Sequence, residues 1–478
     1  MTKQLEELKP IDGDTVKMYA CGPTVYDFFH VGNARCFVIF DFLRRYLEYR
    51  GYKVNFTQNF TDIDDKLIRR ANEEGTTVKE VAEKYIEEYF TDAKGLGIRP
   101  ATNHPKATEN IPEIIDIVKT LEDGGYAYAV SPDGNSSDKD VYFRTRKFKG
   151  YGKLSHKNID DLESGARIDI SDIKEDPLDF AVWKAAKPGE PYWDSPWGKG
   201  RPGWHIECSA MSRKYLGANI DIHAGGEDLA FPHHENEIAQ SESYNACCGC
   251  DNVSFTNIWL HNAYILTDGV KMSKSGVSFK VRDAAKAYGY EAIRFFIISA
   301  HYRSPVNYSE SAMHQAQVSV ERLHTCEENL DFRIKAQTEN NPDSKLTEAE
   351  KSLLCGFEDR KKQMCDALDN DFNTADGIAA IFELTRDINR ALADDKLSLE
   401  FLKSAKDIFM ELVTLFGFEK KQSAENGSED EQIEALVKER AEAKKAKDFA
   451  KADRIRDDLK AMGVVIEDTP QGPKWKRV

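Results

Sequence analysis

The fold is decided by residues 16–60, VKMYACGPTVYDFFHVGNARCFVIFDFLRRYLEYRGYKVNFTQNF. The run VKMYAC at 16–21 predicts a short strand, and KVNFTQNF at 53–60 predicts a second strand. Residues 33–50 predict a helix because apolar side chains recur there at helical spacing, at Ile39, Phe42, Leu43, Tyr46 and Leu47. Strand, helix and strand in this order form a βαβ unit, so we predict an α/β fold with a parallel sheet.

The loop between the first strand and its helix is where such folds bind ligands. His30-Val31-Gly32-Asn33 occupies this loop. Gly32 would let the backbone approach a ligand closely, and the helix N-terminus offers N–H groups and a positive dipole end to phosphate. The chain has neither a Walker A motif nor GxGxxG, which argues against an ordinary P-loop or dinucleotide site.

A second phosphate candidate is KMSKS at 271–275, in a polar segment. Lys271 and Lys274 could neutralise the charge that builds up between the α- and β-phosphates of a nucleotide. A short Lys/Ser segment alone is more typical of a solvated turn. Paired with the His30 loop about 240 residues earlier, it favours a nucleotide site.

A metal site is indicated only weakly by local spacing. His233 and Glu237 stand four residues apart in FPHHENEIAQS, so on a helix they would share one face. Imidazole and carboxylate suit zinc, which also accepts thiolates, and Cys21 and Cys208 are candidates for these. However, such a pair is common on a solvated helix, and a lone cysteine is more often a small core residue.

Three further thiols stand close together, at Cys247, Cys248 and Cys250. No partner pair follows at the spacing of a zinc ribbon or zinc finger. We therefore interpret them as reduced cysteines of a surface loop, with metal binding as the less favoured alternative.

Composition is that of a soluble globular protein, with 478 residues, 41% hydrophobic and 31% charged. No run of about 18 apolar residues occurs and the charged N-terminus does not fit a signal peptide, so we expect no membrane span. Nine cysteines, an odd number, favour reduced thiols and a cytoplasmic protein. The net charge of −16 argues against indiscriminate nucleic-acid binding but leaves room for a local basic patch.

The rest of the chain divides by composition and periodicity. Residues 76–130 are mainly helical in pattern, 131–140 form a polar loop, and 141–203 are rich in Gly, Pro and aromatic residues, typical of an insertion with short strands. Residues 204–300 resemble the second half of the α/β domain. Further on, we expect helices over 311–417, a low-complexity linker over 420–432, a charged helix that begins near Ile433, and a basic tail.

At this point the sequence resembles the class I aminoacyl-tRNA synthetases. HVGN is similar to the HIGH motif of that class, and KMSKS is present in full. The cysteinyl-tRNA synthetase family is the best match, over nearly the whole chain, in the motifs CGPTVYDFFHVGNAR (21–35), NFTDIDDKLI (59–68), GRPGWHIECSAM (200–211), DIHAGGEDLAFPHHENEIAQS (221–241), DFNTADGI (371–378) and EDTPQGPKWKR (467–477).

The resemblance implies a fold and its division into domains. A Rossmann-like parallel-sheet catalytic domain would carry an insertion and be followed by an all-α helical bundle and a small C-terminal domain. The expected domains are catalytic (1–100 and 204–300), connective insertion (101–203), tRNA-binding helical bundle (301–419) and anticodon-binding (433–478).

The resemblance also implies the chemistry, which is ligation of L-cysteine to tRNA(Cys) through a cysteinyl-adenylate. One zinc ion per chain would be held by Cys21, Cys208, His233 and Glu237, and this ion would bind the thiolate of the substrate. Serine and alanine offer zinc no equivalent ligand, so they would be rejected. Magnesium would accompany ATP, and the protein would be a monomer. The expected cysteine pocket is formed by Gly22, Thr61, Trp204 and His223.

For ATP, the resemblance implies contacts from His30, Gly32, Asn33, Gly226 and Asp228. Asp228 would accept hydrogen bonds from the ribose, and Lys274, assisted by Lys271, would stabilise the departing pyrophosphate. His30, Asn33, Lys271 and Lys274 are the expected catalytic residues.

The chain departs from the family pattern at three places, one of which is the polar loop SPDGNSSDKD (131–140), longer than usual for the family. Asn33 stands where the namesake motif has a second His, and Gly276-Val277-Ser278 follows the lysine segment in place of a Leu-Gly-Asn-like run.

Three alternatives remain. A cysteine ligase of the mycothiol pathway would share the adenylate chemistry but lack a region like 311–478. An inert zinc-containing RNA-binding paralogue would have lost some of the motif residues, whereas all are present here. The C-terminal helices could also form only a protein-interaction module.

Overall fold

A computed structural model describes residues 2–134, 136–158, 173–250, 253–267, 270–271, 279–420, 427–469 and 472–477. The chain divides into two compact units. The first unit contains Met1–Val318 together with the short segment Ala367–Ala375, and the second contains Ser319–Asp366 and Asp376–Val478. Each unit is described below by itself.

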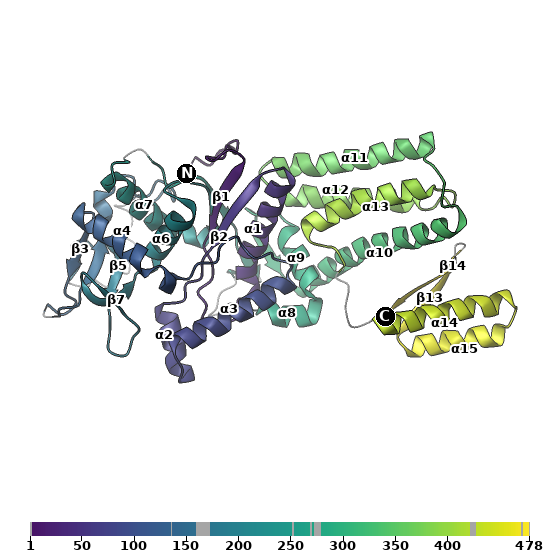
Figure 1. The fold of residues 1–478 in the computed structure, drawn as a ribbon, viewed down its shortest axis with the longest axis horizontal. Helices are drawn as coiled ribbons and strands as arrows, with labels where there is room; N and C mark the ends of the chain where they lie inside the picture. The colour runs from purple at the N-terminus through teal and green to yellow at the C-terminus, as the bar shows by residue number, and fades with distance from the viewer. Residues whose placement is uncertain are drawn as a thin grey trace. The chain divides into compact units, whose positions relative to one another are not determined.

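The centre of the first unit is a parallel sheet with the strand order β2-β1-β8-β9. Strands β1 and β2 of this sheet lie side by side in Figure 1. Its strands are β1 (Thr15–Ala20), β2 (Lys53–Gln58), β8 (Ile220–Gly226) and β9 (Thr256–Asn262). The predicted βαβ unit is confirmed, because helix α1 (Val31–Tyr49) connects β1 to its parallel neighbour β2. Residues 204–300, which were predicted to belong to the same domain, supply β8 and β9 of this sheet.

Helix α1 is buried on nearly all sides. The five residues of its predicted apolar stripe are all less than 9% exposed. Burying each such side chain stabilises the fold by roughly 1.5–3 kcal/mol, so the stripe is enough to fix the helix on the sheet. Two charged side chains, Arg35 and Asp41, are buried with it. Asp41 is compensated by Arg294, whose Nη2 lies 3.0 Å from its carboxylate.

The strand order places a crevice in the sheet. From β1 the chain passes through α1 to β2 on one side, whereas from β8 it passes through α7 (Glu235–Cys247) to β9 on the other. The connections therefore diverge between β1 and β8. In open α/β sheets, ligands bind at the carboxyl ends of the strands at such a switch point.

An antiparallel sheet with the order β3-β4-β5-β7-β6 is inserted between the halves of the central sheet. Its core joins helix α4 to the strands through Ile114, Leu121, Phe143 and Trp183, which confirms the predicted insertion with short strands. The polar stretch 131–140 lies largely in the β3–β4 connection. The bounds are α4 (Ile111–Asp123), β3 (Ala127–Val130), β4 (Asp140–Phe143), β5 (Phe180–Ala185), β6 (Trp193–Ser195) and β7 (Gly198–Pro202).

A small sheet with the order β11-β10-β12 completes the first unit. Its strands are β10 (Ile265–Thr267), β11 (Val270–Lys271) and β12 (Val306–Tyr308). Further α-helices in the described part of this unit are α2 (Asp65–Glu74), α3 (Val78–Gly95), α6 (Trp204–Leu216), α8 (Val281–Tyr288) and α9 (Tyr290–Ile298).

The second unit is mainly helical, as the pattern over 311–417 predicts. Helix α13 buries Phe401, Phe409, Leu412 and Phe416, which lie on one side of the helix. The long helices are α10 (Glu310–Asn340), α11 (Glu348–Asp369), α12 (Thr374–Ala391) and α13 (Leu399–Phe416).

The C-terminal part of the second unit has a small core of its own, formed by Ile433, Val437, Ile455, Leu459 and Val464. It consists of α14 (Gly427–Lys445), α15 (Phe449–Ala461) and the hairpin β13 (Val464–Thr469) and β14 (Gly472–Arg477). The predicted linker over 420–432 is therefore wrong from Gly427 onward, where α14 begins. The predicted basic tail is a strand, because Trp475 packs against this core through pairing with Ile466.

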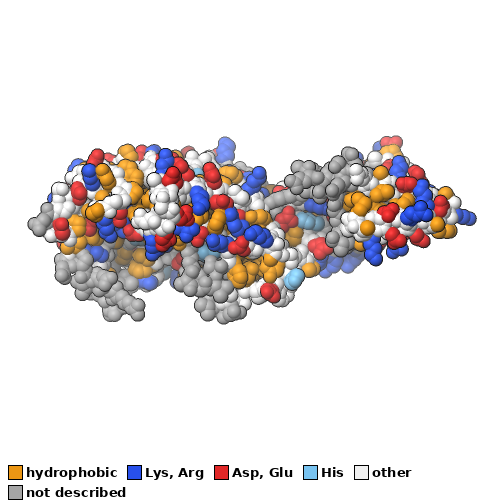
Figure 2. All heavy atoms as spheres, turned by 90° about the horizontal axis from the view of Figure 1, so that it is seen from below, with side chains coloured by type: hydrophobic (Ala, Val, Ile, Leu, Met, Phe, Trp, Pro, Cys, Tyr) orange, Lys and Arg blue, Asp and Glu red, His pale blue; other side chains and the backbone are white. Residues whose placement is uncertain are grey.

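Lys and Arg side chains are interspersed with Asp and Glu on the face drawn in Figure 2. Within the described residues, none of the helices is both long and apolar enough to cross a membrane.

Candidate metal centre and adjoining cleft

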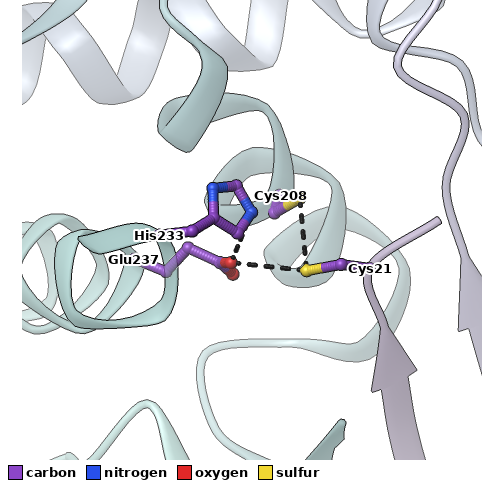
Figure 3. Close-up of side chains that lie close together, drawn as sticks. All are labelled: Cys21, Cys208, His233 and Glu237. Carbon is purple, nitrogen blue, oxygen red and sulfur yellow. Dashed lines mark hydrogen bonds and ion pairs between the residues drawn. The ribbon is translucent and has the colours of Figure 1, made fainter. Parts of the chain in front are cut away.

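Four side chains predicted as metal ligands meet at the carboxyl end of the central sheet (Figure 3). Cys21 directly follows β1, and Cys208 lies in α6. His233 lies in the turn Ala230–His234, and Glu237 in the first turn of α7 that follows it. All four are buried, between 0% and 6% exposed. The structure thus brings together residues that local spacing could not join.

The distances between these side chains fit a tetrahedral centre. The two Sγ atoms lie 3.9 Å apart, and Cys21 Sγ lies 3.5 Å from Glu237 Oε1. His233 Nε2 lies 3.0 Å from the same oxygen. Zinc bonds of about 2.0–2.3 Å at tetrahedral angles give ligand–ligand distances of roughly 3.3–3.8 Å. Two sulfurs, one nitrogen and one oxygen are also a donor set that zinc accepts.

The ionisation of the cluster is set by burial and by neighbouring charge. Burial opposes the ionised form of Glu237, but His223 and His233 outweigh it and lower its pKa to about 2. Burial likewise opposes protonation of His233, but Glu237 and Cys208 raise its pKa to about 10. A hydrogen bond from the Cys21 thiol lowers the pKa of Cys208 to about 6, whereas burial raises the pKa of Cys21. A bound cation would displace the proton on His233 Nε2, because that lone pair would be needed for coordination.

Neighbouring side chains orient these groups. Glu237 Oε2 lies 2.8 Å from His223 Nε2, and His233 Nδ1 lies 2.8 Å from His205 Nδ1. The Trp204 ring stacks on the His233 imidazole with the ring centroids 4.3 Å apart. Such contacts behind a ligand fix its rotamer and are a common feature of metal sites.

A second possible ligand set shares two residues with the first. Cys21, His223, His234 and Glu237 also offer ligand atoms within 4.8 Å of one another. His234 Nε2 lies 3.4 Å from Cys21 Sγ, and His234 Nδ1 lies 2.8 Å from His261 Nε2. Neither His234 nor His261 was predicted from the sequence as a possible ligand. Two signals were available in the sequence. His234 directly follows His233, and His261 stands near the carboxyl end of β9.

A cleft with a volume of about 380 Å³ adjoins the cluster. Its lining includes one of the predicted metal ligands, Cys21, together with the next residue Gly22 and with Trp204, which stacks on His233. It also includes every described residue predicted to bind ATP, namely His30, Gly32, Asn33, Gly226 and Asp228. Residues predicted to bind cysteine and residues predicted to bind ATP therefore line one cleft, at the carboxyl ends of β1 and β8.

Hydrogen bonds to backbone N–H groups fix the part of the cleft at the start of α1. The Asn33 N–H donates to His30 Nδ1 over 3.2 Å, so His30 caps the N-terminus of α1. The Val31 N–H donates to the carbonyl of Phe279, where the chain returns after the lysine segment. An N-terminus of this kind attracts phosphate through its N–H groups and its dipole.

Gly22 is required at its position. Its N–H donates to Asn59 Oδ1 over 3.0 Å, and a Cβ atom there would lie 1.6 Å from the carbonyl oxygen of Asn59. Any side chain at residue 22 would therefore push Cys21 and its neighbours away from the end of β2.

Two of the predicted pocket residues lie behind the cleft wall. Among the residues that the structure describes, neither Thr61 nor His223 lines the cleft, and both are at most 2% exposed. Thr61 Oγ1 donates to Glu207 Oε2 over 3.0 Å, and His223 contacts Glu237 as described. The Thr61 backbone also bonds to Pro23 and Val25 of the cleft wall, whereas His223 contacts the predicted metal ligand Glu237.

The lysine segment is described only in part. Lys271 lies in β11, where its backbone pairs with Leu266, whereas Lys274 lies outside the described residues. Cys247, Cys248 and Cys250 lie at and beyond the end of α7 and are exposed. No metal-binding group among the described residues includes them.

Three family profiles match the chain. The one described as "tRNA synthetases class I (C) catalytic domain" matches residues 7–318. The "DALR domain" matches 363–420, and the "Cysteinyl-tRNA ligase anticodon binding domain" matches 427–475.

Curated relatives are similar along their entire length. A cysteine–tRNA ligase of Clostridioides difficile is 53% identical over 479 residues, covering 100% of this chain and 99% of the relative. Those of Caldicellulosiruptor saccharolyticus and Geobacillus thermodenitrificans are 52% and 50% identical, each covering 100% of this chain and 98% of the relative.

Solved structures share the fold at low sequence identity. Mycobacterium tuberculosis methionyl-tRNA synthetase, in complex with methionyl-adenylate, has a TM-score of 0.59 at 14% identity, covering 84% of this chain and 90% of that one. The agnB2 LeuRS–tRNA–LeuAMS ternary complex of Agrobacterium radiobacter K84 has a TM-score of 0.63 at 12% identity, covering 86% and 85%. The chain therefore shares its overall fold with these two solved structures.

Proposed function

The chain belongs to the cysteine–tRNA ligase family of class I aminoacyl-tRNA synthetases, and from this premise we propose how its cleft activates cysteine. The proposed reaction uses ATP to form cysteinyl-adenylate and then transfers the cysteinyl group to tRNA(Cys). One observation carries the proposal, namely that Cys21, a member of the four-ligand cluster, lines the same cleft as His30 and Asn33. The thiol end and the phosphate end of the reaction thereby share one cavity.

We propose that Cys21, Cys208, His233 and Glu237 hold one zinc ion. Bound there, zinc would hold the thiolate of the substrate and so select cysteine over serine, whose hydroxyl is hard to deprotonate and is a poorer ligand for this site. The protein supplies a dry, pre-oriented donor set, since all four side chains are buried and His205, His223 and Trp204 contact them.

The cysteine pocket is assigned to Gly22, Thr61, Trp204 and His223. Gly22 and Trp204 would contact the amino acid directly, because they line the cleft. Trp204 remains 42% exposed, which is unusual for so large an apolar ring and fits a side chain that covers a ligand. Thr61 and His223 would act through Glu207 and Glu237.

ATP is assigned to the other cleft residues. The N-terminus of α1, with His30, Gly32 and Asn33, would bind phosphate oxygens, and Asp228 would accept hydrogen bonds from the ribose, with Gly226 leaving room beside it. Lys274, assisted by Lys271, would stabilise the pyrophosphate. Magnesium would accompany ATP and neutralise part of its charge.

The proposed steps need no protein nucleophile. An oxygen of the cysteine carboxylate attacks the α-phosphorus in line and pyrophosphate leaves. A hydroxyl of the terminal adenosine of tRNA then attacks the carbonyl carbon, and AMP leaves. Such chemistry depends on positioning and on stabilising charge in the transition state.

We propose that residues 301–419 and 433–478 bind tRNA and that 1–100 and 204–300, with the insertion 101–203, carry the chemistry. The match of residues 427–475 to an anticodon-binding family supports this and disfavours the mycothiol-type ligase and a pure protein-interaction module. Reduced cysteine ligands suit the cytoplasm, and we propose a monomer there.

The proposal is tested by ATP–pyrophosphate exchange. Exchange should depend on cysteine and stay near background with serine or alanine, and the protein as isolated should contain one zinc per chain. Charging of tRNA(Cys) should follow. The proposal is abandoned if cysteine does not stimulate exchange, or if serine stimulates it equally.

A further inference from the structure

The turn between α11 and α12 contains the first residues of the DFNTADGI motif (371–378) and belongs to the first unit. Only Ala367–Ala375 joins that unit, whereas the helices on both sides belong largely to the second unit. Asp371 and Phe372 have φ values of 56° and 62°. Two consecutive non-glycine residues in the left-handed region are unfavourable and persist only where the surroundings hold them, which is a feature of functional sites.

One side of this turn is fixed to helix α1. The Phe372 ring packs edge-on against Phe42, with centroids 5.4 Å apart, and against Tyr46 at 5.6 Å. The Tyr46 hydroxyl donates to Asp369 Oδ1 over 2.6 Å. Helix α1 is the element whose N-terminus carries His30, Gly32 and Asn33.

The other side of the turn is fixed to the connection between α9 and β12. Asp371 Oδ1 accepts from the Tyr302 hydroxyl over 2.9 Å, and the Asp371 carboxylate pairs with Arg303. The Asp371 carbonyl lies 2.9 Å from His301 Nε2, and Thr374 Oγ1 donates to the carbonyl of Ala300 over 3.1 Å.

Arg35 of α1 reaches the same connection. Its guanidinium donates to the carbonyl of Tyr264 over 2.7 Å and to that of Ser304 over 2.5 Å. These carbonyls flank the paired strands β10 and β12, and β10 in turn pairs with β11, which ends at Lys271. Helix α1, whose N-terminus is proposed to bind phosphate, is therefore hydrogen-bonded to the chain beside β10 and β12. Strand β11, which leads to the lysine segment, pairs with β10, so the contacts of the turn and those of Arg35 reach the same region.

We propose that Asp371 and Phe372 are positioning residues for cysteine activation, which hold α1 and the β10–β12 pair at a fixed spacing. This inference rests on the proposed function, because the two elements act together only if both contact ATP. A shift between them would separate His30 and Asn33 from the cations that act on the same phosphates. Misplacing a catalytic group by about 1 Å lowers a rate on the order of a hundredfold.

The test measures single-turnover formation of cysteinyl-adenylate in full-length variants loaded with zinc. Asp371→Gly keeps the left-handed backbone but removes the carboxylate, and Phe372→Ala removes the contact with α1. We expect each to lower the rate constant at least about tenfold, with the apparent affinity for cysteine changed less than about twofold. Asp371→Asn tolerates the same φ and restores an acceptor for Tyr302, so it should recover most of the rate.

A control is Lys447→Gly, which alters another non-glycine residue of positive φ, at 60°, in the second unit. Lys447 lies in the region proposed to bind tRNA, and tRNA is absent from this reaction. Its rate constant should equal that of the wild type. A variant that is merely partly unfolded would lower the amplitude of the burst and leave the rate constant alone. Rate constants within about twofold of the wild type in both Asp371→Gly and Phe372→Ala, or a loss of amplitude only, would overturn the inference. A wild-type protein without cysteine-dependent activity would instead overturn the proposed function.

Discussion

Glu237 uses both of its carboxylate oxygens, one near His233 and one near His223. It therefore belongs to both possible ligand sets, as does Cys21. Cys208 and His233 belong only to the first set, and His223 and His234 only to the second. Single substitutions can consequently decide which set holds the metal.

Replacing Cys208 by Ser should remove the zinc and weaken cysteine binding at least about a hundredfold, with little effect on ATP, because the thiol anchor is lost. Metal content and the KM values for cysteine and ATP in pyrophosphate exchange measure this. His234→Asn is the matched variant and should retain zinc. Loss of zinc from His234→Asn together with its retention in Cys208→Ser would assign the metal to the second set.

His104 is a half-buried histidine outside the cleft lining, and it should make stability depend on pH. Its Nε2 accepts the Ala101 N–H over 2.9 Å and its Nδ1 lies 3.0 Å from the carbonyl of Gln58, which fits the neutral ring. Burial lowers its pKa from 6.5 to about 4. The unfolded chain thus binds the proton more readily, and the stabilisation is complete above pH 6.5 and declines as the pH falls towards 4.

The predicted decline is a few kcal/mol at most, since each pKa unit corresponds to about 1.4 kcal/mol. Urea unfolding of the first unit at pH 7.5 and at pH 4.5 measures it, and His104→Gln should reduce the difference between the two conditions. An unchanged difference in that variant would assign the pH dependence to other groups.

At the scale of elements, the loop after β1 has no room to adjust. Replacing Gly22 by Ala would force a Cβ against the carbonyl of Asn59 and displace Cys21. We expect cysteine-dependent exchange to fall at least about a hundredfold, because the shift moves a ligand and a cleft residue together. Gly356→Ala in α11 is the control, since a Cβ there meets nothing within 4 Å. That variant should keep full activity and gain roughly 0.5–1 kcal/mol of stability.

Local elements were predictable where one physical signal dominated. The apolar stripe of α1 predicted a helix over 33–50, within two residues of the observed bounds Val31–Tyr49 at each end. The prediction succeeded because the buried residues there recur at helical spacing. Helix α14 was placed too late because its first turn, GSED, has the composition of a linker. Strand β14 was missed because its sequence GPKWKR is basic, and only pairing with β13 makes it a strand.

The candidate site was predictable only through resemblance. Cys21 and Cys208 each look like isolated small residues in the sequence, and it is the alignment of β1, α6 and α7 in space that joins them. His234 was overlooked because the spacing argument concerned His233 and Glu237 alone. The DFNTADGI motif was counted with the helical half, since nothing local reveals that Phe372 packs on Phe42.

At the scale of the whole molecule, the C-terminal hairpin region should be separable. Residues 427–477 have their own core and lie beyond the described end of the helical region at 420. A chain of residues 1–420 should keep cysteine-dependent exchange within about threefold of the wild type. Its charging of tRNA(Cys), measured as kcat/KM, should fall at least about a hundredfold because the matched anticodon-binding region is absent.

Equal charging by the shortened and complete chains would contradict the proposed role of residues 433–478. A loss of exchange would show instead that these residues support the fold of the remainder. Thermal unfolding of the shortened chain separates the two outcomes.

The return of the chain to the first unit at Ala367–Ala375 has a consequence for biosynthesis. A ribosome that has made residue 318 must still translate all of residues 319–366 before this segment exists, which takes on the order of a few seconds. During that interval the nascent N-terminal part exposes the aromatic surface of Phe42 and Tyr46 that Phe372 later covers. The helical half is therefore translated, in part, before the ATP-binding half can finish folding.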